Sequence, residues 1–587
     1  MAICPQCATE FSLTDADKTV LERFKVPQPR LCPDCRQQRR CAFRNESKLY
    51  QRTCSRCGKS IIAIFSTNKP FLVYCPECYW SDEWDGRSFG REYDFNRSFF
   101  EQFQELQRFV PVQSNNVVNS ENCLYNNYCL DSKDCYMSVR LSHDENILYS
   151  YLALNSLACV DCYNVIRCQY CYECVDVWDC YNCFFSVLCK NSSDLAFCYD
   201  CIGCRNCFGC VGLRNAEYCF FNEKYSKEEY QQKLKQYYLG SYNRLVDVKR
   251  TFFEKDLIKF PRRALQIVNS ENAFGNHIDN SRDIHYCFDV DKTESARYGY
   301  GIYFSRDVWD CSFTYGAENC YENISNYESS NILFSYVTYA GTHDVQYCMM
   351  CYNGTHDCFG CIGLKKEQYC ILNKQYSKEE YEEIVPRIID SMRVEETRNK
   401  IQTNSKFEIQ NSTIVSKFKI RNSKFTPLSY GEFFPVIMSY FAYNETVAQS
   451  YFPLSRDEVL ARGWKWKDEE TKERHTHNYQ LPDDIAATGD EVSSQVFSCS
   501  CKECSDHAGK ACERNFKIIP QELAFHKQFS IALPRFCPEC RSNARARLRS
   551  LRRLHERTCQ KCGKRIMSAY GTESPETVWC SECYTKG

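Results

Sequence analysis

The sequence predicts a mainly β, multidomain protein: two β-solenoid blocks of short-coil, parallel β-helix type, flanked by zinc-ribbon modules and joined by helical connectors. Two observations carry this prediction. CxxC knuckles recur at both ends of the chain, and paired knuckles supply thiolates to tetrahedral Zn²⁺. Between them, a twelve-residue period runs through two long segments, which is typical of solenoids built from short stacked repeats.

Composition indicates a multidomain protein of the cytoplasm. The chain has 587 residues, 44 of them cysteine, and a formal net charge of −1, and this length suits three or four domains. Its first residues, MAICPQC, lack the basic start and apolar core of a signal peptide. No stretch approaches the roughly 18 apolar residues of a membrane span. We therefore expect a reducing compartment, metal-bound thiolates and no membrane partner.

Shifts in composition divide the chain into seven segments. They are a double zinc-ribbon module (1–85), a helical or irregular connector (86–115), a first solenoid block (116–225), a helical connector (226–264), a second solenoid block (265–376), a stretch of helical connector, low-complexity insertion and linker (377–498), and a second double zinc-ribbon module (499–587).

The two terminal modules are copies of one sequence. Shifting the first by 505 positions places seven cysteines on seven cysteines. The predicted zinc ligands are Cys4, Cys7, Cys32, Cys35, Cys54, Cys57, Cys75 and Cys78 in the first module, and Cys504, Cys512, Cys537, Cys540, Cys559, Cys562, Cys580 and Cys583 in the second. Pairing in sequence order gives about four Zn²⁺ ions; a cross-braced pairing is the alternative.

The third site lacks one ligand by simple alignment, because Gly509 stands where Cys4 stands in the first module. We expect Cys504 to complete it, with Cys499 and Cys501 as alternatives. Four closed thiolate ligands are typical of structural zinc and leave no open position for a substrate, so no catalytic residue is predicted. Reactive or redox-active CxxC pairs are the competing interpretation.

The motifs ICPQCATEF…VPQPRLCPDCR and ACERNF…LPRFCPECR resemble a small bacterial zinc-ribbon domain of the form CxxC-x3-F…P-x-x-C-x-x-C-R. Ribbons flanking a cysteine-rich repeat region are similar to uncharacterised multidomain bacterial zinc-ribbon proteins. This resemblance covers the terminal modules and implies zinc binding only. It implies no activity.

The middle of the chain is a second duplication. CFGCVGLRNAEYCFFNEKYSKEEY (207–230) recurs as CFGCIGLKKEQYCILNKQYSKEEY (358–381). The twelve-residue ladder of the first copy runs through Cys123, Cys135, Ile147, Cys159, Cys171, Cys183, Leu195, Cys207 and Cys219. The second runs through Ile284, Ala296, Val308, Cys320, Ile332, Val345, Cys358 and Cys370, with two one-residue expansions.

Ile, Ala and Val at ladder positions of the second copy cannot bind metal, whereas buried Cys packs as a small hydrophobe. We therefore predict a narrow packed core of Cys, Ser and Ala. Metal or iron–sulfur sites, disulfides and a 24-residue coil remain alternatives.

Helix caps mark the connectors. Capping boxes are predicted at Ser226 with Glu229, at Ser377 with Glu380, and at Ser455 with Glu458, where the helix stops near Gly463. The low-complexity repeat at 404–425 is expected to be a surface insertion. Residues 467–498, with His475 and His477, are interpreted as a solvated linker.

Basic residues, all but one of them arginine, stand at every fourth position after the second knuckle in both modules. The two sets are Arg36, Arg40, Arg44, Lys48 and Arg52, and Arg541, Arg545, Arg549, Arg553 and Arg557. One helix running from knuckle to knuckle would align them as a basic stripe, which is the footprint expected of contacts to a nucleic-acid backbone. A protein partner, or arginines that bond the module's own groups, are the alternatives.

The sequence thus favours a non-enzymatic zinc-binding scaffold that grips nucleic acid in a salt-sensitive way, with a protein–protein scaffold as the alternative. A carbohydrate-binding or carbohydrate-active β-helix is the further alternative, resting on aromatic residues and on Asp131, Asp134, Asp144, Asp161, Asp176, Asp179 and Asp200. These carboxylates form no repeated outward pair, which weighs against a glycosidase.

Overall fold

A computed structural model describes residues 1–310, 312–318, 320–322, 324–339, 341–403, 429–468, 479–501, 512, 514–550 and 552–586. The predicted insertion at 404–425, His475, His477 and Cys504 lie outside these residues. The chain divides into two compact units, residues 1–114 with 265–467, and residues 115–264 with 468–587. Each unit therefore joins one terminal module to the repeat block that is farther from it in the sequence.

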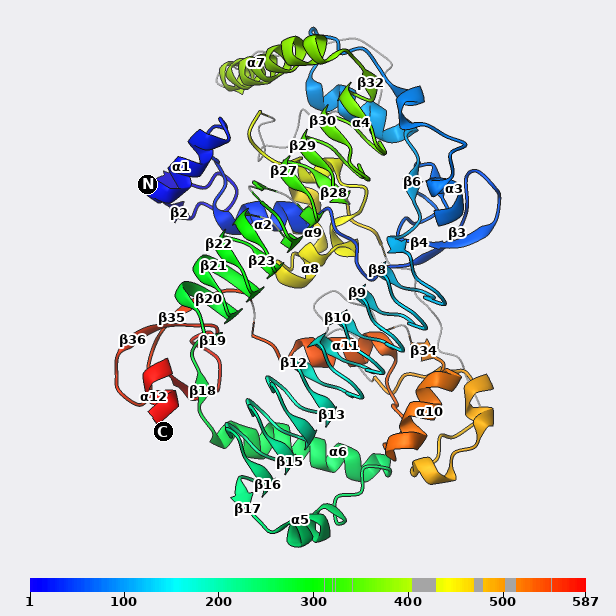
Figure 1. Cartoon of the computed structure of the whole chain (residues 1–587), viewed down its shortest axis with the longest axis vertical. Coiled ribbons are helices and arrows are strands. Elements are labelled where there is room, and N and C mark those ends of the chain that lie inside the picture. The colour runs from blue at the N-terminus through cyan, green and yellow to red at the C-terminus, as the bar shows by residue number, and fades with distance from the viewer. Residues whose placement is uncertain are drawn as a thin grey trace. The chain divides into compact units, whose positions relative to one another are not determined.

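The N-terminal module (1–114) consists of two small ribbons followed by a helix (Figure 1). Its elements are β1 (Ala2–Ile3), β2 (Glu10–Phe11), α1 (Asp15–Arg23), α2 (Pro33–Cys41), β3 (Tyr50–Thr53), β4 (Ser60–Ala63), β5 (Val73–Tyr74), α3 (Pro76–Trp80), η1 (Gly86–Phe89), α4 (Phe99–Phe109) and β6 (Val112–Gln113). Strand β6 pairs with β5 immediately before the chain enters the first repeat block.

After two short 3-10 helices, the C-terminal module repeats the order of β1 to α3, and its described residues contain no counterparts of η1, α4 and β6. Its elements are η7 (Ile485–Ala487), η8 (Asp490–Ser494), β33 (Phe497–Ser498), β34 (Asn515–Phe516), α10 (Pro520–Phe529), α11 (Pro538–Ala546), β35 (His555–Thr558), β36 (Arg565–Ser568), β37 (Val578–Trp579) and α12 (Ser581–Lys586). The hairpins β3–β4 and β35–β36 have matching registers, Tyr50 opposite Ala63 and His555 opposite Ser568.

Both repeat blocks consist mainly of parallel strands, in agreement with the prediction of a mainly β protein with parallel sheets. The strands of the first block are β7 (Val117–Val118), β8 (Asn127–Leu130), β9 (Val139–Ser142), β10 (Tyr151–Leu154), β11 (Tyr163–Ile166), β12 (Val175–Trp178), β13 (Tyr181–Phe184), β14 (Ser193–Ala196), β15 (Arg205–Phe208), β16 (Glu217–Phe220) and the antiparallel β17 (Glu223–Lys224). Tyr151 pairs with Tyr163, and Tyr163 with Val175, so the register is the twelve-residue period, not 24 residues.

The second block has the same organisation. Its strands are β19 (Ile267–Val268), β20 (Glu271–Asp279), β21 (Arg282–Asp291), β22 (Glu294–Arg297), β23 (Tyr300–Tyr303), β24 (Arg306–Trp309), β25 (Ser312–Tyr315), β26 (Ile324–Tyr327), β27 (Ser330–Leu333), β28 (Tyr336–Tyr339), β29 (His343–Gln346), β30 (His356–Phe359), β31 (Gln368–Ile371) and β32 (Lys374–Gln375). Ser330 pairs with His343, and His343 with His356, which places the two expansions where the sequence predicts them.

A second period, of three residues, lies inside each twelve-residue turn. Asn146, Tyr149, Leu152 and Asn155 all have positive φ, between 52° and 60°, so the backbone turns a corner at every third residue. One residue between successive corners points inward. Cys159, Cys162, Val165 and Cys168 are completely buried in this way, and such a narrow core explains the preference for small side chains.

Inward Cys and Ser also satisfy the backbone at the corners. The Cys162 Sγ lies 3.4 Å from the Val160 carbonyl oxygen and 3.5 Å from that of Cys171. The Ser150 hydroxyl donates to the Leu148 carbonyl at 3.0 Å and accepts from the Cys162 N–H at 3.0 Å. A buried carbonyl without a partner is costly, so a small donor is favoured at these positions. The described cysteines of this core are free thiols, and all but the half-buried Cys123 are buried.

One inward position carries a carboxyl group. Asp144 is 3% exposed and its oxygens accept from the backbone N–H groups of Ser142 and Ser156. Burial raises the pKa of the Asp144 carboxyl to about 8. Because the folded pKa lies above the unfolded value, the folded protein binds a proton between about pH 4 and 8 that the unfolded chain does not bind. The free energy of unfolding therefore falls as pH rises through this range, by up to about 1.4 kcal/mol per pH unit.

We expect Asp144→Ser to stabilise the protein at pH 8 by about 1–3 kcal/mol, and less at pH 5. Serine suits this site because Ser132, one turn earlier, donates to the Leu130 carbonyl and accepts from the Asp144 N–H. Urea denaturation at the two pH values measures the effect, with Ser156→Ala as the control. An equal effect at both pH values would contradict a buried, proton-linked carboxyl.

The connectors begin at the predicted caps. Ser226 and Glu229 cap α5 (Lys227–Leu234), and Ser455 and Glu458 cap α9 (Arg456–Ala461). Ser377 and Glu380 bond reciprocally at the start of α7 (Lys378–Thr403). The other connector elements are α6 (Tyr242–Arg250), η2 (Thr251–Asp256), η3 (Leu257–Lys259), β18 (Arg262–Arg263), η5 (Val436–Met438), η6 (Tyr443–Glu445) and α8 (Val447–Tyr451).

An aromatic strap, residues 429–467, packs inside the first unit. Phe433, Phe434, Tyr440 and Phe441 are at most 2% exposed and share a hydrophobic core with the N-terminal module and the second block. No sequence motif predicts this strap. In the part of the chain that the structure describes, no helix is both long and apolar enough to cross a membrane.

Candidate metal centres and arginine clamps

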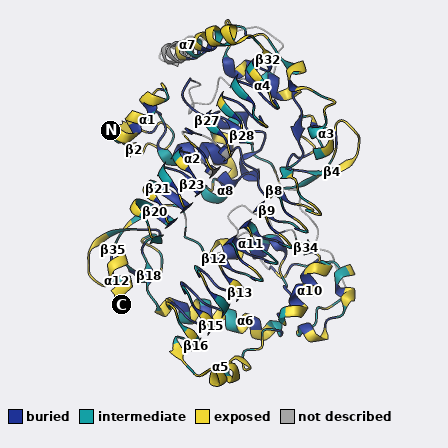
Figure 2. Cartoon of the chain, viewed as in Figure 1, coloured by how far each residue is buried: buried dark blue, intermediate teal, exposed yellow. Residues whose placement is uncertain are grey.

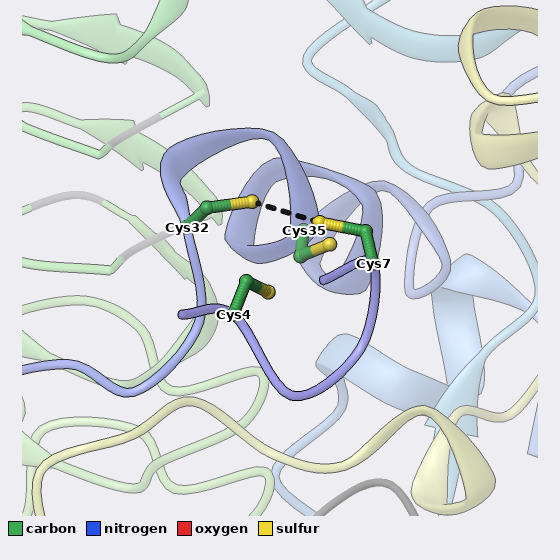
Figure 3. Close-up of side chains that lie close together, drawn as sticks. All are labelled: Cys4, Cys7, Cys32 and Cys35. Carbon is green, nitrogen blue, oxygen red and sulfur yellow. Dashed lines mark hydrogen bonds between the residues drawn. The ribbon is translucent and has the colours of Figure 1, made fainter. Parts of the chain in front are cut away.

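Four groups of four cysteines could each hold a metal ion. Within each group the Sγ atoms lie within 4.8 Å of one another. The groups are Cys4, Cys7, Cys32 and Cys35; Cys54, Cys57, Cys75 and Cys78; Cys499, Cys512, Cys537 and Cys540; and Cys559, Cys562, Cys580 and Cys583. In the first group the four side chains point toward a common centre (Figure 3). These groups are compatible with zinc-ribbon-like modules and follow the sequential pairing.

The sulfur spacing suits zinc. Across the two knuckles of each site, one pair of Sγ atoms lies 3.6 Å apart for Cys7–Cys32, 3.8 Å for Cys57–Cys75, 3.8 Å for Cys512–Cys537 and 3.9 Å for Cys562–Cys580. Tetrahedral zinc with Zn–S bonds of about 2.3 Å requires sulfurs about 3.8 Å apart. Four thiolates therefore fit a closed structural ion.

Backbone geometry aims the sulfurs. In the CxxCG knuckle the Gly58 N–H donates to the Cys54 carbonyl at 3.1 Å, and this turn requires φ of +74° at Gly58. The second knuckle of each site opens a helix, so Cys32 and Cys537 are the N-caps of α2 and α11. The Cys75 N–H points at the Cys54 Sγ from 3.3 Å, the kind of contact that orients a thiolate ligand.

Among the described residues, Cys499 is the fourth cysteine of the third group, whereas the expected ligand, Cys504, lies outside them. Cys499 follows β33, which pairs with β34 antiparallel, as β1 pairs with β2 just before Cys4. Its Sγ receives the Cys537 N–H at 3.2 Å. The short strand before this cysteine, FS in FSCSC, is the sequence signal for it. The alignment of the two modules misses this signal because Cys499 and Cys512 are about ten residues farther apart than Cys4 and Cys7.

The arginine segments do not form one helix from knuckle to knuckle. Helix α2 ends at Cys41 and α11 at Ala546, and the chain then turns into the β3 and β35 hairpins. The predicted single stripe is therefore wrong. The hairpin residues Arg52 and Arg557 instead donate to carbonyls of their own ribbons, including those of Ser66 and Gly571.

In the first unit the arginines of α2 are buried against the second block. The Arg36 Nε donates to Asp310 at 2.6 Å, and Arg40 lies 3.6 Å from the same carboxylate. Both side chains are at most 1% exposed, and α2 is drawn as buried in Figure 2. Arg39 bridges Glu322 of the block, at 2.6 Å, and Glu432 of the aromatic strap, at 2.8 Å.

The second unit repeats this arrangement with α11 and the first block. Arg541 pairs with Asp161, and the Arg545 Nη1 lies 2.7 Å from the other oxygen of the same carboxylate. Arg541 also reaches Glu522 of α10 at 2.9 Å. Asp161 and Asp310 both lie two residues after their ladder positions, Cys159 and Val308, so the two docking contacts are equivalent.

Three successive turns of each block present one acidic column to the module: Tyr149, Asp161 and Glu173 in the first block, and Tyr298, Asp310 and Glu322 in the second. The guanidinium carbon of Arg541 lies 4.7 Å from the ring centre of Tyr149, and that of Arg36 lies 5.6 Å from that of Tyr298. We call each column with its module arginines an arginine clamp.

Electrostatics keep the clamps charged. Burial is the largest single influence on the Arg36 guanidinium and lowers its pKa, but Asp310, together with Tyr321 and Glu322, raises the pKa above its usual value. The pKa of Arg541 behaves in the same way, with Asp161 and Glu522 as the counter-charges. A buried cation that faces a carboxylate is costly to separate from it, so the clamps hold modules and blocks together.

The other basic residues of the two predicted stripes differ in their surroundings. Arg44 pairs with Glu46 of its own module and Arg549 with Asp176 of the first block. Lys48 is half-buried and Arg553 is exposed. The prediction of an exposed basic stripe for nucleic acid is therefore wrong for five of its residues. Those five are buried: Arg36, Arg40, Arg44, Arg541 and Arg545.

A second contact fixes the other end of each module. Tyr79 and Tyr584, equivalent under the 505-residue shift, both approach glycines of the last block turns, Gly363 and Gly212. Lys365 lies among Tyr79, Trp80 and Trp84, 4.5–5.1 Å from the ring centres. The Tyr584 hydroxyl donates to Asp200 at 2.6 Å. Each module is thus anchored at two points along its block.

The seven aspartates of the carbohydrate alternative are engaged within the protein. Asp131, Asp134 and Asp176 accept from Asn119, Asn122 and Asn164 of the preceding turn, and Asp179 pairs with Arg167. Asp161 and Asp200 belong to docking contacts, and Asp144 is inside the core. None of these arrangements resembles the paired carboxylates of a glycosidase.

We expect the buried His526 to make the second unit sensitive to acid. This side chain occupies the position of Leu21 in the first module, is fully buried, and bonds through Nδ1 to the Ile531 carbonyl. Burial lowers the pKa of His526 to about 4, and Arg541 adds to the effect. Since the folded pKa lies below the unfolded value, the unfolded state binds a proton more readily between about pH 6.5 and 4, and stability is lost as pH falls through this window.

We expect His526→Leu to remove about 2 kcal/mol of destabilisation between pH 7 and pH 5. Leucine copies the first module, and Leu21→His is the converse variant, which should make the first unit acid-sensitive. Thermal unfolding at both pH values measures the difference. An unchanged pH slope in His526→Leu would assign the acid sensitivity to another group.

A scan against models of known protein families finds no match, and a search of curated proteins finds no similar sequence.

Proposed function

We propose that the protein is a non-enzymatic, zinc-stabilised scaffold in which each double zinc module clamps one β-solenoid block. One observation carries this proposal: ligand and docking residue are neighbours in the sequence, Cys35 before Arg36 and Cys540 before Arg541. The ion that folds the module therefore also fixes the helix whose arginines hold the block.

The solenoid interpretation is supported by the twelve-residue parallel register and by a core in which every third side chain points inward. Stacked turns of this kind make a rigid body with extended outer faces. Free buried thiols suit a reducing compartment, so we place the protein in the cytoplasm.

The partner that we propose is a protein that binds the outer faces of the blocks. Five of the arginines expected to contact nucleic acid are buried within their units. This burial weighs against nucleic acid, because backbone contacts to phosphate need accessible cations. The alternative remains testable because Arg553 and other exposed cations are left on the modules.

Elemental analysis of the purified protein, combined with its 260/280 nm absorbance before and after a high-salt wash, tests the proposal. We expect about four zinc ions per chain, no iron, and an absorbance ratio typical of protein alone. Iron, or substantially more than four zinc ions, would reassign the cysteines of the blocks. Nucleic acid removed only by high salt would restore the nucleic-acid alternative.

A further inference from the structure

The two arginine clamps differ at one position, and the difference concerns the second carboxylate of each acidic column. In the first unit, Glu322 receives Arg39 from the zinc module at 2.6 Å. In the second unit the residue equivalent to Arg39 is Ala544. There the corresponding carboxylate, Glu173, is paired instead with Lys249, which comes from helix α6.

Glu322 and Glu173 are each paired with a different cation, Arg39 and Lys249. Glu322 is completely buried and also contacts the backbone N–H of Phe433. Burial raises the pKa of Glu322, and Arg39 is the largest opposing influence. For Glu173, burial is again the largest single influence and acts to raise the pKa, but Lys249, together with Arg545 and Arg541, lowers the pKa below its usual value. Among the cations near each carboxylate, Arg39 acts most strongly on Glu322 and Lys249 acts most strongly on Glu173.

Exchanging the modules would break both balances. The C-terminal module on the second block would place Ala544 beside Glu322 and leave that buried carboxylate without the guanidinium that pairs with it directly. The N-terminal module on the first block would bring Arg39 to Glu173, which Lys249 already neutralises. Like charges forced together and buried charges left unpaired both exclude a wrong partner.

We propose that Arg39, Ala544 and Lys249 form a charge code that makes each acidic column the recognition surface for one zinc module only. The shared residues, Arg36 with Asp310 and Arg541 with Asp161, supply attachment in both clamps. The code supplies the choice between two otherwise equivalent docking surfaces. It explains how a chain with two similar modules and two similar blocks reaches one pairing, and it does not depend on which partner the scaffold binds.

A suppressor experiment in the full-length, zinc-loaded protein tests the code. Lys249→Gln should leave Glu173 unpaired, lower the urea midpoint of the second unit and raise amide exchange in the peptides around Tyr149–Glu173. Ala544→Arg, added to Lys249→Gln, should restore most of the loss, because the introduced guanidinium would supply the cation as Arg39 does in the first unit. Ala544→Arg alone should lower the midpoint modestly, since two cations then compete for Glu173.

Ala544→Met with Lys249→Gln is the matched control, because methionine adds similar bulk without charge and should rescue nothing. Zinc content should stay at about four throughout, which separates this test from that of the scaffold itself. Equal rescue by methionine, or additive effects of Lys249→Gln and Ala544→Arg, would overturn the charge code. Rescue by Ala544→Arg that Glu173→Gln abolishes would establish that the code acts through this carboxylate.

Discussion

Cys540→Ser should remove one zinc ion of about four and release the C-terminal module from the first block. Cys540 is both a cysteine of the third candidate metal centre and a residue of α11, whose next residue is Arg541. Structural zinc binding supplies folding free energy, of order 10 kcal/mol or more in zinc-finger peptides, and this exceeds what the rest of a small ribbon provides. Without the ion, α11 loses its fixed start and the clamp loses its cations.

Metal analysis and amide exchange measure this result together. We expect zinc to fall from about four to about three and exchange to rise over Tyr149–Glu173 of the first block, while the second block stays protected. Cys35→Ser is the mirror variant and should affect only the second block. Cys562→Ser should also remove one ion, but it should loosen the contact of Tyr584 with Asp200 before it loosens the clamp.

Cys171→Ser provides the control inside the block. Cys171 is a completely buried core residue, so serine there should leave zinc at about four and cost about 1–2 kcal/mol as a packing defect. If Cys171→Ser lowered the metal content, the thiols of the block would be ligands and the packed-core interpretation would be wrong.

The sequence predicts the periodic parts of this structure and misses contacts between distant segments. The twelve-residue register and the ligands of three metal centres follow from spacing, because each is fixed by residues near one another in the chain. The three-residue corner period was also present in the sequence: positions of Cys and Val recur every third residue through 159–168. It was obscured by the variable corner residues between them.

The arginines show why the site could not be predicted completely. A stripe at i, i+4 spacing is the same pattern whether its helix faces solvent or another part of the chain. What decides between the two is the pair of carboxylates, Asp310 and Asp161, which lie 274 and 380 residues away from Arg36 and Arg541. In each block the acid stands at a corner position where other turns carry different residue types, so its role appears only when the module lies against it.

The triple change of Arg541, Arg545 and Arg549 to Gln should destabilise the second unit by at least about 3–5 kcal/mol, the usual cost of breaking a buried ion pair. Removing these guanidinium groups leaves Asp161, Glu522 and Asp176 buried without their cations. Urea denaturation should show a lower midpoint, and zinc at the third site should exchange faster with a chelator because the docked helix is freed.

Two comparisons separate docking from surface charge. Arg553→Gln removes an exposed cation of the same module and should change stability by no more than about 0.5 kcal/mol. Adding Asp161→Asn to Arg545→Gln should recover part of the loss, because removing both charges avoids an unpaired buried carboxylate. An exposed stripe that served only an external partner would give the opposite pattern, with the triple variant as stable as Arg553→Gln.

The same triple variant also decides the remaining question about nucleic acid. If the arginines act only in the clamp, any weak binding by the native protein should keep its salt dependence in the variant, apart from the loss of folded protein. If they contacted phosphates, the slope of log affinity against log salt should fall by about 0.7–0.9 for each contact removed. Burial of Arg541 and Arg545 to 4% exposure or less favours the first outcome, since a phosphate oxygen could reach them only after the module had left its block.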